Sequence, residues 1–389
     1  MTRRQRLCGG LATWLLTLGA VRLVIAQPEH CGTVSVERLD HAIDEAVGWA
    51  SRTQGADGRF IYRYDARADA DLGFYEFVRH AGLTMALYQA AGTGVDGART
   101  VAEKADTYAR AHLVAAGGGQ ALAPVVDDGQ YDIGATALFL NALLYRRALG
   151  DTADDETLLV GLGRFLVANV APSGAVAAYW DARAAAPITS TSSPFYTGEA
   201  LWAIARLERL FPGAWRDPAL RIARYLATAR DDAEGRWPDV PDHWAAYALA
   251  EMARWPATSG LDDTLVAYAR HIGALESMQI RYESQRTGTW FSRATRGQTG
   301  LGAGVGALAE ALMSLRSVPA LAGDQVLRRR AECAAGVLLH RQTSPTVAAR
   351  YPNPARARGA WIRNGITQID DQQHALSALL LLRDLEATS

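Results

Sequence analysis

The sequence lacks any excess of one charge. Its 40 lysines and arginines stand against 41 aspartates and glutamates, for a formal net charge of -1. A nucleic-acid-binding domain usually carries enough basic residues to raise its pI well above neutrality, so this balance argues against nucleic acid as a partner. Charged residues make up only 21% of the chain and hydrophobic residues 49%, which excludes a disordered, collagen-like or coiled-coil protein. We therefore expect a globular body with a large core.

Long apolar runs are also lacking, except at the N-terminus. Basic residues at Arg3, Arg4 and Arg6 precede an apolar run from Leu7 to Val21. Val24-Ile25-Ala26 follows before Gln27, with the small Ala26 at the expected cleavage point. This layout is typical of a secretory signal peptide. We therefore expect residues 1–26 to be a signal peptide, residues 27–389 to form a single domain, and the protein to be periplasmic or secreted, with no membrane span after signal removal. Arg22 interrupts the run, and an uncleaved N-terminal anchor is the alternative.

Cysteine is scarce. Cys8 belongs to the expected signal peptide, which leaves Cys31 and Cys333 in the mature chain. Neither has a neighbouring cysteine or histidine at metal-binding spacing, so we expect no metal site. Two cysteines in an oxidising compartment suggest one disulfide, although two unpaired thiols would explain the sequence equally well.

Runs of valine and isoleucine are few, whereas alanine and leucine are abundant, and this composition favours helix over sheet. Only residues 59–64 alternate in a way that would suit a short ribbon. The 3.6-residue periodicity of the apolar side chains predicts twelve helices. They cover residues 36–53, 75–92, 99–116, 132–149, 156–170, 195–210, 217–229, 242–255, 262–279, 301–315, 324–342 and 371–387.

The twelve expected helices alternate between two kinds. The first, third and following odd-numbered ones are amphipathic, with one charged side, as expected of an outer layer. The even-numbered ones are almost free of charge beyond their first turn and rich in small residues, as expected of buried helices that approach one another closely. An inner and an outer helix alternating six times predict an all-α (α/α)6 toroid. An open superhelix of helical pairs is the alternative.

In such a toroid all six inner helices run in the same direction, so their N-terminal ends meet on one face. The polar residues of the expected inner helices gather at those ends. Each has a structural explanation, such as a helix N-cap or a hydrogen-bonded core histidine. Their convergence on one cavity is harder to explain that way, because buried charge is costly unless it is used or paired. The candidate residues are Glu76, Arg79, His80, Asp132, Glu199, Asp242, His243, Asp370, Asp371, Gln373 and His374.

Aromatic residues accompany this face. Flat rings beside carboxylates suit sugars, whose C–H faces stack on aromatic side chains while their hydroxyls bond to acids and amides. Packing of the long loops against the rim would account for part of the set. The aromatic candidates for substrate binding are Tyr62, Tyr196, Trp237, Trp244 and Trp361.

Five segments resemble a group of bacterial six-hairpin toroid proteins. The group includes six-hairpin glycosidases and uronate-active lyases and epimerases. The resemblance runs over most of residues 36–387 and implies the fold. It also implies a carbohydrate substrate, because most members of that superfamily act on carbohydrates. Terpene cyclases have a related toroid, so the fold alone does not fix the substrate. The segments are Asp57-Gly58-Arg59-Phe60, Val78-Arg79-His80-Ala81-Gly82, Phe195-Tyr196-Thr197-Gly198-Glu199-Ala200-Leu201, Asp242-His243-Trp244 and Ile369-Asp370-Asp371-Gln372-Gln373-His374-Ala375.

The sequence departs from the related toroids of other chemistry. It has no DxDD or DDxxD run in a suitable inner helix, and Asp370-Asp371 is followed by Gln-Gln-His, which does not present a diphosphate-binding acidic pair. It has no cluster of cysteine and histidine for zinc and no GxSxG motif. We therefore expect no cofactor and no metal.

These observations predict an exported enzyme that acts on an oligosaccharide or polysaccharide, in particular one bearing carboxylates. Hydrolysis needs one protonated and one ionised carboxyl, and Glu199 and Asp242 are the expected pair. Arg79 would bind an anionic group and His80 would orient or relay a proton. On a uronate polymer the same cavity could run elimination or epimerisation, with His243 or Tyr196 as the base. A non-catalytic glycan-binding or scaffold protein of polysaccharide export and a terpene-cyclase-like toroid are the alternatives.

The two mature cysteines lie at the two ends of the expected ring. Cys31 precedes the first outer helix and Cys333 lies in the last one. In a closed ring these hairpins are neighbours, so a disulfide between the two would close the seam where no peptide bond joins the hairpins.

Overall fold

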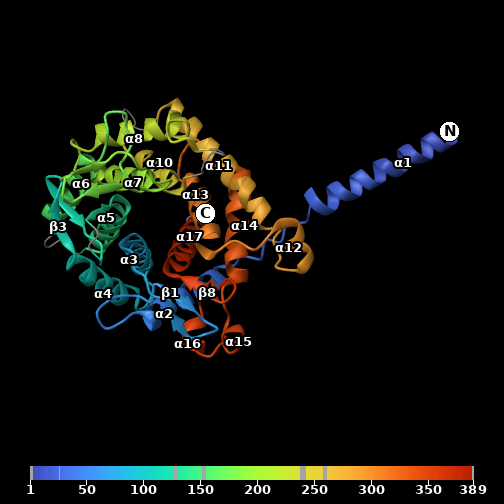
Figure 1. The fold of residues 1–389 in the computed structure, drawn as a ribbon, viewed down its shortest axis with the longest axis horizontal. Helices are drawn as coiled ribbons and strands as arrows, with labels where there is room; N and C mark the ends of the chain where they lie inside the picture. The colour runs from blue at the N-terminus through green and yellow to red at the C-terminus, as the bar shows by residue number, and fades with distance from the viewer. Residues whose placement is uncertain are drawn as a thin grey trace.

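The computed structural model describes residues 3–25, 27–126, 129–150, 155–236, 242–256 and 261–387. Six inner helices form a ring, and each packs against the next around it (Figure 1). The last inner helix packs against the first, so the ring is closed and the open superhelix is excluded. The inner helices are α3 (Phe77–Gly92), α5 (Ile133–Ala148), α7 (Tyr196–Leu210), α10 (His243–Met252), α13 (Gly302–Leu315) and α17 (Ile369–Ala387).

Six outer helices surround this ring. All twelve helices predicted from periodicity are present, and the prediction of an (α/α)6 toroid is confirmed. The outer helices are α2 (Val36–Thr53), α4 (Ala98–Arg110), α6 (Asp155–Ala168), α8 (Arg216–Thr228), α11 (Asp263–Glu283) and α14 (Gln325–Arg341). The loops also contain the short helices α9 (Arg230–Ala233), α12 (Trp290–Arg296), α15 (Pro345–Ala348) and α16 (Pro354–Ala357).

Small residues let the inner helices approach closely. A Cβ at Gly306 of α13 would collide with the backbone of His374 and Ala375 on α17. A Cβ at Gly302 would likewise meet the backbone of Asp371. Glycine is therefore needed where α13 and α17 cross, and this close approach brings the start of α17 against α13.

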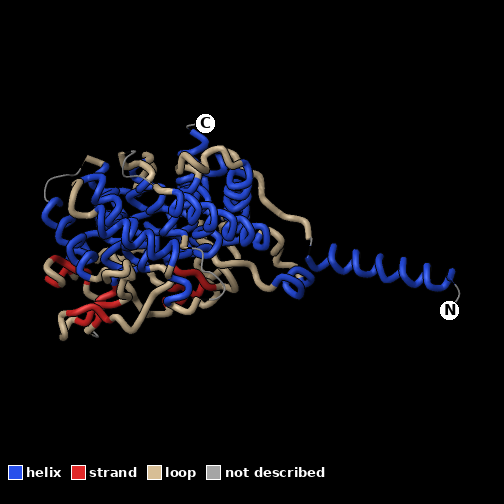
Figure 2. The backbone as a smooth tube through the Cα atoms, turned by 90° about the horizontal axis from the view of Figure 1, so that it is seen from above, coloured by secondary structure: helices blue, strands red, loops and turns tan. Residues whose placement is uncertain are grey.

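Short strands lie on one face of the ring (Figure 2). The sequence predicted one short ribbon, at residues 59–64, whereas the described residues contain three small sheets. Residues 113–116 were expected to be helical, but they form a strand because Gly117 and Gly118 turn the chain into a hairpin. Since β5 leads into α5 and β8 into α17, this face is where inner helices begin. The described strands form three sheets, ordered β2 (Ala70–Asp71), β1 (Arg63–Asp65), β8 (Ile366–Gln368); β3 (Leu113–Ala116), β4 (Gly119–Leu122); and β5 (Gln130–Asp132), β6 (Tyr179–Asp181), β7 (Ala186–Ile188).

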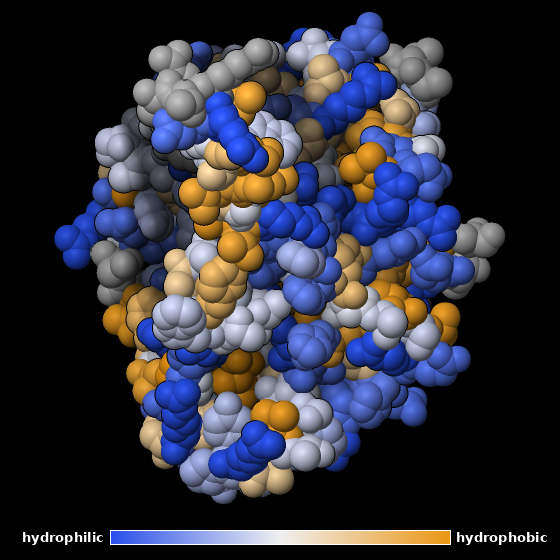
Figure 3. Space-filling model, turned by 90° about the vertical axis from the view of Figure 1, so that its right-hand side faces the viewer, coloured by the Kyte–Doolittle hydropathy of each residue, from blue (hydrophilic) through white to orange (hydrophobic). Residues whose placement is uncertain are grey.

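The N-terminal segment projects from the body as α1 (Arg3–Ala20) and the π-helical turn η1 (Val21–Ile25) (Figures 1 and 2). Within it, Leu7–Val24 is long and apolar enough to cross a membrane, with a mean hydropathy of 1.6 and none of it buried. The side of the molecule from which it emerges carries hydrophobic residues scattered among hydrophilic ones (Figure 3). An exposed apolar N-terminal helix fits a signal peptide. Ala26, after which cleavage is expected, lies outside the described residues.

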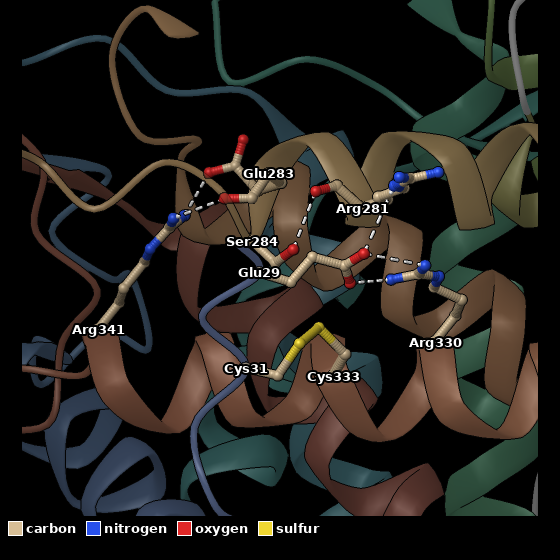
Figure 4. The surroundings of a disulfide bond; sticks show 8 residues. All are labelled: Glu29, Cys31, Arg281, Glu283, Ser284, Arg330, Cys333 and Arg341. Carbon is tan, nitrogen blue, oxygen red and sulfur yellow. Dashed lines mark hydrogen bonds and ion pairs between the residues drawn. A yellow bond between two sulfur atoms is a disulfide. The ribbon is translucent and has the colours of Figure 1, made fainter. Parts of the chain in front are cut away.

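Residues 27–34 then run as a strap across α11 and α14 (Figure 4). Cys31 is joined to Cys333 of α14 by a disulfide, with the two α carbons 4.6 Å apart. Beside it, Glu29 forms ion pairs with Arg281 of α11 and Arg330 of α14. The backbone N–H of His30 donates to the carbonyl of Ser284 at 2.9 Å. The strap therefore ties the start of the chain to the last outer helices, at the seam of the ring.

This geometry predicts that the disulfide stabilises the ring. The bond spans 302 residues, and the chain-entropy model gives a loop of that length a contribution on the order of 5 kcal/mol. We expect reduction to lower the midpoint of denaturant unfolding, and the double variant Cys31→Ala, Cys333→Ala to have the lower midpoint with or without reductant. Two reactive thiols in addition to Cys8 in the denatured, unreduced protein would contradict the bond.

Candidate active site

A cavity of about 560 Å³ opens among the N-terminal ends of the inner helices. Most of the polar residues predicted at these ends lie in its wall. Four side chains that the sequence analysis did not select complete the polar and aromatic lining: Ser193, Phe195, Glu276 and Gln279. The predicted residues in the wall are Glu76, Arg79, Tyr196, Glu199, His243, Trp244, Asp370, Gln373 and His374.

Two histidines face each other in this cavity. His243 is the first residue of α10 and His374 lies in the first turns of α17, and their ring centres are 4.9 Å apart. Nδ1 of His374 is 2.6 Å from Oε2 of Glu310, which lies behind it on α13. The hydroxyl of Tyr247 donates to the other oxygen of Glu310 at 3.0 Å. His374 is thus held by a buried carboxylate that is itself held in place.

The two histidines have opposite electrostatic surroundings. The Glu310 carboxylate raises the pKa of His374 despite its burial, which acts in the opposite direction. Burial, and the charge of His374, lower the pKa of His243 well below its usual value. Nε2 of His243 is buried and has no hydrogen-bond partner among the described residues. The surroundings therefore favour the charged form of His374 and the neutral form of His243, and the centres of the two rings are 4.9 Å apart.

The same three residues could group around a metal ion. One ligand atom from each of His243, Glu310 and His374 lies within 4.8 Å of the others. Ligands about 2 Å from a tetrahedral metal lie roughly 3.3 Å from one another, so the grouping would have to contract. It would also have to give up the short contact between Glu310 and His374. The arrangement suits proton transfer better than metal binding.

Glu199 and Glu276 are buried carboxyls with unused hydrogen-bonding capacity. Glu199 lies on α7 and is 3% exposed, and Glu276 lies on α11 and is 1% exposed. Oε2 of each has no partner among the described residues. Burial, with the nearby charge of Asp242, raises the pKa of both well above the usual value. Burial therefore favours the neutral, protonated form of both carboxyls.

A glycine on the neighbouring helix makes room for Glu199. A Cβ at Gly134 of α5 would collide with the carboxyl of Glu199 and with the ring of Tyr196. The small residue at the start of α5 thus lets the carboxyl side chain of Glu199 enter the space between two inner helices. The local sequence is adapted to hold this carboxyl at the cavity wall.

Arg79 is not free to bind an anion as expected from the sequence. Its guanidinium forms an ion pair with Asp370 at 3.0 Å and donates to the hydroxyl of Tyr62 at 2.8 Å and to Oε1 of Gln368 at 3.3 Å. Tyr62 in turn donates to Glu76 at 2.9 Å. Tyr62 is buried beneath the wall and is not part of the cavity. Arg79 therefore organises the rim, with its charge already balanced.

Asp242 is a helix cap and not a free acid or base. Oδ1 accepts from the backbone N–H groups of Trp244 and Ala245, both at 3.1 Å, and Oδ2 forms a buried ion pair with Arg230 at 3.1 Å. It is fully buried and does not line the cavity. Burial raises its pKa to about 6, against the pull of Arg230. Both of its oxygens are already used, so this geometry does not support the catalytic role expected for Asp242.

Asp371 has a similar structural role. Its Oδ1 accepts from the N–H of Ala303, at the start of α13, and its Oδ2 from the N–H of Gln368. Burial raises its pKa to about 7. Asp371 joins two inner helices, is fully buried and does not line the cavity, so this geometry does not support the substrate contact expected for it.

His80 is also structural. Its Nδ1 lies 2.6 Å from the hydroxyl of Tyr75 and its Nε2 lies 2.9 Å from the carbonyl of Ala105 on α4. It is fully buried away from the cavity, and burial lowers its pKa to about 4. Both ring nitrogens of the neutral imidazole are satisfied, so this geometry does not support the expected proton relay through His80.

The remaining predicted residues lie elsewhere. Trp361 is buried, donates to the carbonyl of Leu338 at 2.9 Å, and lines a separate cavity of about 830 Å³ on the other side of α13. Asp132 is the N-cap residue of α5, outside the wall, although its charge contributes to the raised pKa of Glu199. Trp237 lies outside the described residues.

The sequence analysis missed Glu310 and Glu276. Glu310 is the one acid within the apolar stretch of α13, and the absence of a basic residue nearby in that stretch was a usable signal. Glu276 belongs to α11, which the pattern assigned to the outer layer. Because α11 packs against α13 as well as α10, its C-terminal half reaches the cavity. The position of this half of α11 beside the cavity depends on how the helices pack, and no local sequence pattern indicates it.

No protein-family model matches this chain and no curated protein sequence is significantly similar to it. Among solved structures, a GH76 α-mannanase from Bacteroides thetaiotaomicron is 10% identical, with 90% of this chain and 96% of that chain covered and a TM-score of 0.62. A sugar epimerase from a ruminal bacterium is 13% identical, with 90% and 98% covered and a TM-score of 0.60. A type II terpene cyclase from Scytonema is 14% identical, with 90% and 100% covered and a TM-score of 0.56. The resemblance to the six-hairpin toroids is therefore confirmed at the level of the fold.

If Asp242 is structural, removing it should destabilise the protein. Breaking a buried ion pair by deleting one partner costs about 3–5 kcal/mol, so we expect a loss of that order in the free energy of unfolding of Asp242→Ala. Asp242→Asn should lose less, because an amide oxygen still caps the helix. In denaturant unfolding, the double variant Arg230→Met, Asp242→Asn should recover part of the loss. Wild-type stability in Asp242→Ala would contradict the assignment.

His80 predicts a pH dependence of stability. Its folded pKa of about 4 lies below its ordinary value of 6.5, so the unfolded chain binds more protons between these values. Stability from this residue is therefore present above pH 6.5 and is lost as pH falls toward 4. His80→Gln should be less stable at pH 7 by roughly 1–3 kcal/mol, because hydrogen bonds are lost, and its stability should fall less steeply over that range. Parallel pH profiles for the variant and the wild type would refute this.

Proposed function

We propose that this protein is a carbohydrate-active enzyme that moves a proton on a sugar bound in the cavity, and so isomerises or epimerises it. The observation that carries the proposal is the His243–His374 pair. Environments that push the pKa values of two neighbouring groups apart create an acid and a base at one pH. Here Glu310 supports the charged form of one histidine, while burial favours the neutral form of the other.

The chemistry needs only these residues and an open-chain sugar. Nε2 of neutral His243 takes the proton from the carbon next to the sugar carbonyl. Protonated His374 gives its proton to the carbonyl oxygen, so that an enediol forms and the C–H bond is the one that breaks. For the isomer, protonated His243 returns its proton to the neighbouring carbon while neutral His374 takes the proton of the hydroxyl that becomes the new carbonyl. For the epimer, the proton on the former carbonyl oxygen passes back through His374 to the opposite face of the same carbon, and the proton on His243 then returns to His374 through solvent. No redox cofactor takes part in this sequence.

Aromatic side chains in the wall support a sugar as the substrate. Phe195, Tyr196 and Trp244 line the cavity beside His243. The ring of Phe195 meets that of His243 at 5.7 Å, and the ring of Trp244 lies 4.4 Å from it. Apolar ring faces next to acid–base groups bind the C–H face of a sugar and leave its hydroxyls toward polar residues. The similar folds of a sugar epimerase and a D-mannose isomerase are consistent with this substrate class.

Glycoside hydrolysis is the second candidate. Glu199 lies in the wall with an oxygen that has no hydrogen-bond partner among the described residues, and burial favours its protonated form, as a general acid requires. GH76 glycoside hydrolases share the fold. Its predicted partner Asp242 is committed to Arg230, so an ionised base would have to come from Glu76 or Asp370. Terpene cyclisation has less support, because Asp371 is occupied between α13 and α17.

Deuterium exchange separates the two reactions. In D₂O, proton transfer at carbon should place solvent deuterium at C2 of the sugar, detected by proton NMR, whereas hydrolysis creates reducing ends without it. We expect His243→Asn and His374→Asn each to lower the exchange rate by roughly 10²- to 10⁴-fold. His271→Asn, on the exposed side of α11, is the matched control. Hydrolysis without exchange would overturn the proposed reaction, and binding without any turnover would indicate the non-catalytic glycan-binding alternative.

Glu310 should set the pH range of the reaction. The protonated form of His374 is the acid, so the rate should fall as pH rises through the raised pKa of His374. Glu310→Gln removes the charge that raises this pKa, and the alkaline limb of the rate profile should move to lower pH. An alkaline limb that does not move in Glu310→Gln would show that His374 is not the acid.

A further inference from the structure

Exposed apolar side chains of the ring body gather on two neighbouring helices at its outer edge. Trp290 and Phe291 begin α12, and both are exposed, as are Met278 and Tyr282 near the C-terminal end of α11. Trp290 is 83% exposed, more than any other large hydrophobic side chain among the described residues. Exposed apolar residues are ordinary when scattered singly, whereas a group of them marks an interaction surface.

The two helices meet at Tyr282. Its hydroxyl donates to the backbone carbonyl of Arg296 on α12 at 3.5 Å. The guanidinium groups of Arg286 and Arg296 lie over its ring, 4.8 Å and 4.9 Å from the ring centre. The exposed apolar side chains of both helices therefore belong to one surface, which we call the α11–α12 surface and define as residues 278–296.

The α11–α12 surface is basic as well as apolar. Residues 278–296 contain four arginines and one acid, Glu283, whose carboxylate is buried and already ion-paired. Glu29 of the strap is a second nearby acid and pairs with Arg281. The side chain of Arg293 is exposed and has no ion pair or hydrogen bond among the described residues. Aromatic rings beside an excess of arginine suit a membrane interface, where rings lie at headgroup level and cations attract anionic lipids.

The N-terminal helix brings a membrane next to this surface. Both a signal peptide and an uncleaved anchor enter a bilayer. The apolar stretch Leu7–Val24 ends three residues before Gln27, a length of chain that reaches at most about 11 Å. Nε2 of Gln27 donates to the hydroxyl of Thr295 on α12 at 2.9 Å, and the N-terminal segment joins the body beside α12 (Figure 1). Since the headgroup layer of one leaflet is roughly 5–8 Å thick, α12 lies at that layer while α1 is in the bilayer.

We propose that the α11–α12 surface is a membrane-contact surface, and that its partner is a phospholipid bilayer with anionic headgroups. Trp290 and Phe291 enter the headgroup layer, and Arg293 pairs with lipid phosphate. The contact holds the ring body against the membrane that the N-terminal helix enters. None of the four exposed apolar side chains lines the candidate active-site cavity, so membrane contact and substrate binding can occur together.

The experiment uses the full chain, made by cell-free synthesis in the presence of lipid vesicles, so that α1 enters the bilayer and no signal peptidase acts. Lipids brominated near the headgroup quench the fluorescence of any tryptophan that they touch. Trp14 of α1 and Trp290 are the exposed tryptophans among the described residues, so the measurement is made in Trp14→Phe. We expect quenching in Trp14→Phe and its loss in Trp14→Phe, Trp290→Phe. The double variant also measures the background from the other tryptophans.

The role of charge is tested in the same Trp14→Phe background. We expect more quenching with vesicles of phosphatidylcholine and phosphatidylglycerol than with phosphatidylcholine alone. One arginine near an anionic membrane is worth about 1 kcal/mol, so Arg293→Gln should lower the ratio of membrane-bound to unbound surface by about 5-fold. Arg164→Gln is the matched control and should leave the ratio unchanged, because Arg164 is exposed on α6, across the ring from α12 (Figure 1).

Three results would contradict the proposal. Equal quenching in Trp14→Phe and in the double variant would show that Trp290 does not reach the lipid. Equal quenching on neutral and anionic vesicles would rule out anionic headgroups as the partner. Emission from Trp290 that is shifted to the blue but not quenched by the brominated lipid would show that a protein, such as a second copy of this chain, covers the surface instead.

Discussion

The parallel direction of the six inner helices is the constraint on which the site depends. A hairpin ring places every inner helix with its N-terminus on the same face, so the side chains of six first turns share one small volume. That volume lies inside the ring, where an unpaired charge is costly. Each acid or base at these ends therefore either has its hydrogen bonds made within the protein or keeps an unpaired polar atom. A ligand can lower the free-energy cost of burying such an atom by bonding to it. The structure contains both kinds side by side.

Asp242 and Glu199 show the difference. Both are acids at the start of an inner helix and both are buried. Both oxygens of Asp242 are bonded, by two backbone N–H groups and by Arg230, whereas Glu199 has an oxygen without a partner among the described residues. Arg230 supports the ring by neutralising the cap of α10 from outside the cavity. Glu199 adds no such support. Burying its unpaired oxygen lowers the stability of the fold, and the cavity is the place where a ligand could bond to that oxygen. The acids of the candidate active site are those whose hydrogen bonds are not completed within the described part of the protein.

The sequence predicted the fold well because its signals are local. Twelve periodic segments, alternating between amphipathic and small-residue types, are enough to give the ring, and their bounds agree with the helices to within a few residues except after Arg110 and at the longer C-terminal end of α11. The site was predicted less well. His80 and Asp242 were indistinguishable in sequence from His243 and Glu199, because their partners, the carbonyl of Ala105 and the side chain of Arg230, come from other elements. Which acid is bonded depends on packing that no local pattern records.

One carboxylate explains why the two histidines differ. Glu310 lies two turns into α13, behind His374. His243 sits against Phe195 and Trp244, and its Nε2 has no hydrogen-bond partner in the described part of the chain. The close crossing of α13 and α17, which requires Gly302 and Gly306, is what brings Glu310 within 2.6 Å of His374. The asymmetry of the pair therefore follows from glycines in the ring wall. A larger side chain at Gly306 would push the helices apart, lengthen that contact and make the surroundings of the two histidines more alike, even though no residue of the cavity wall had changed.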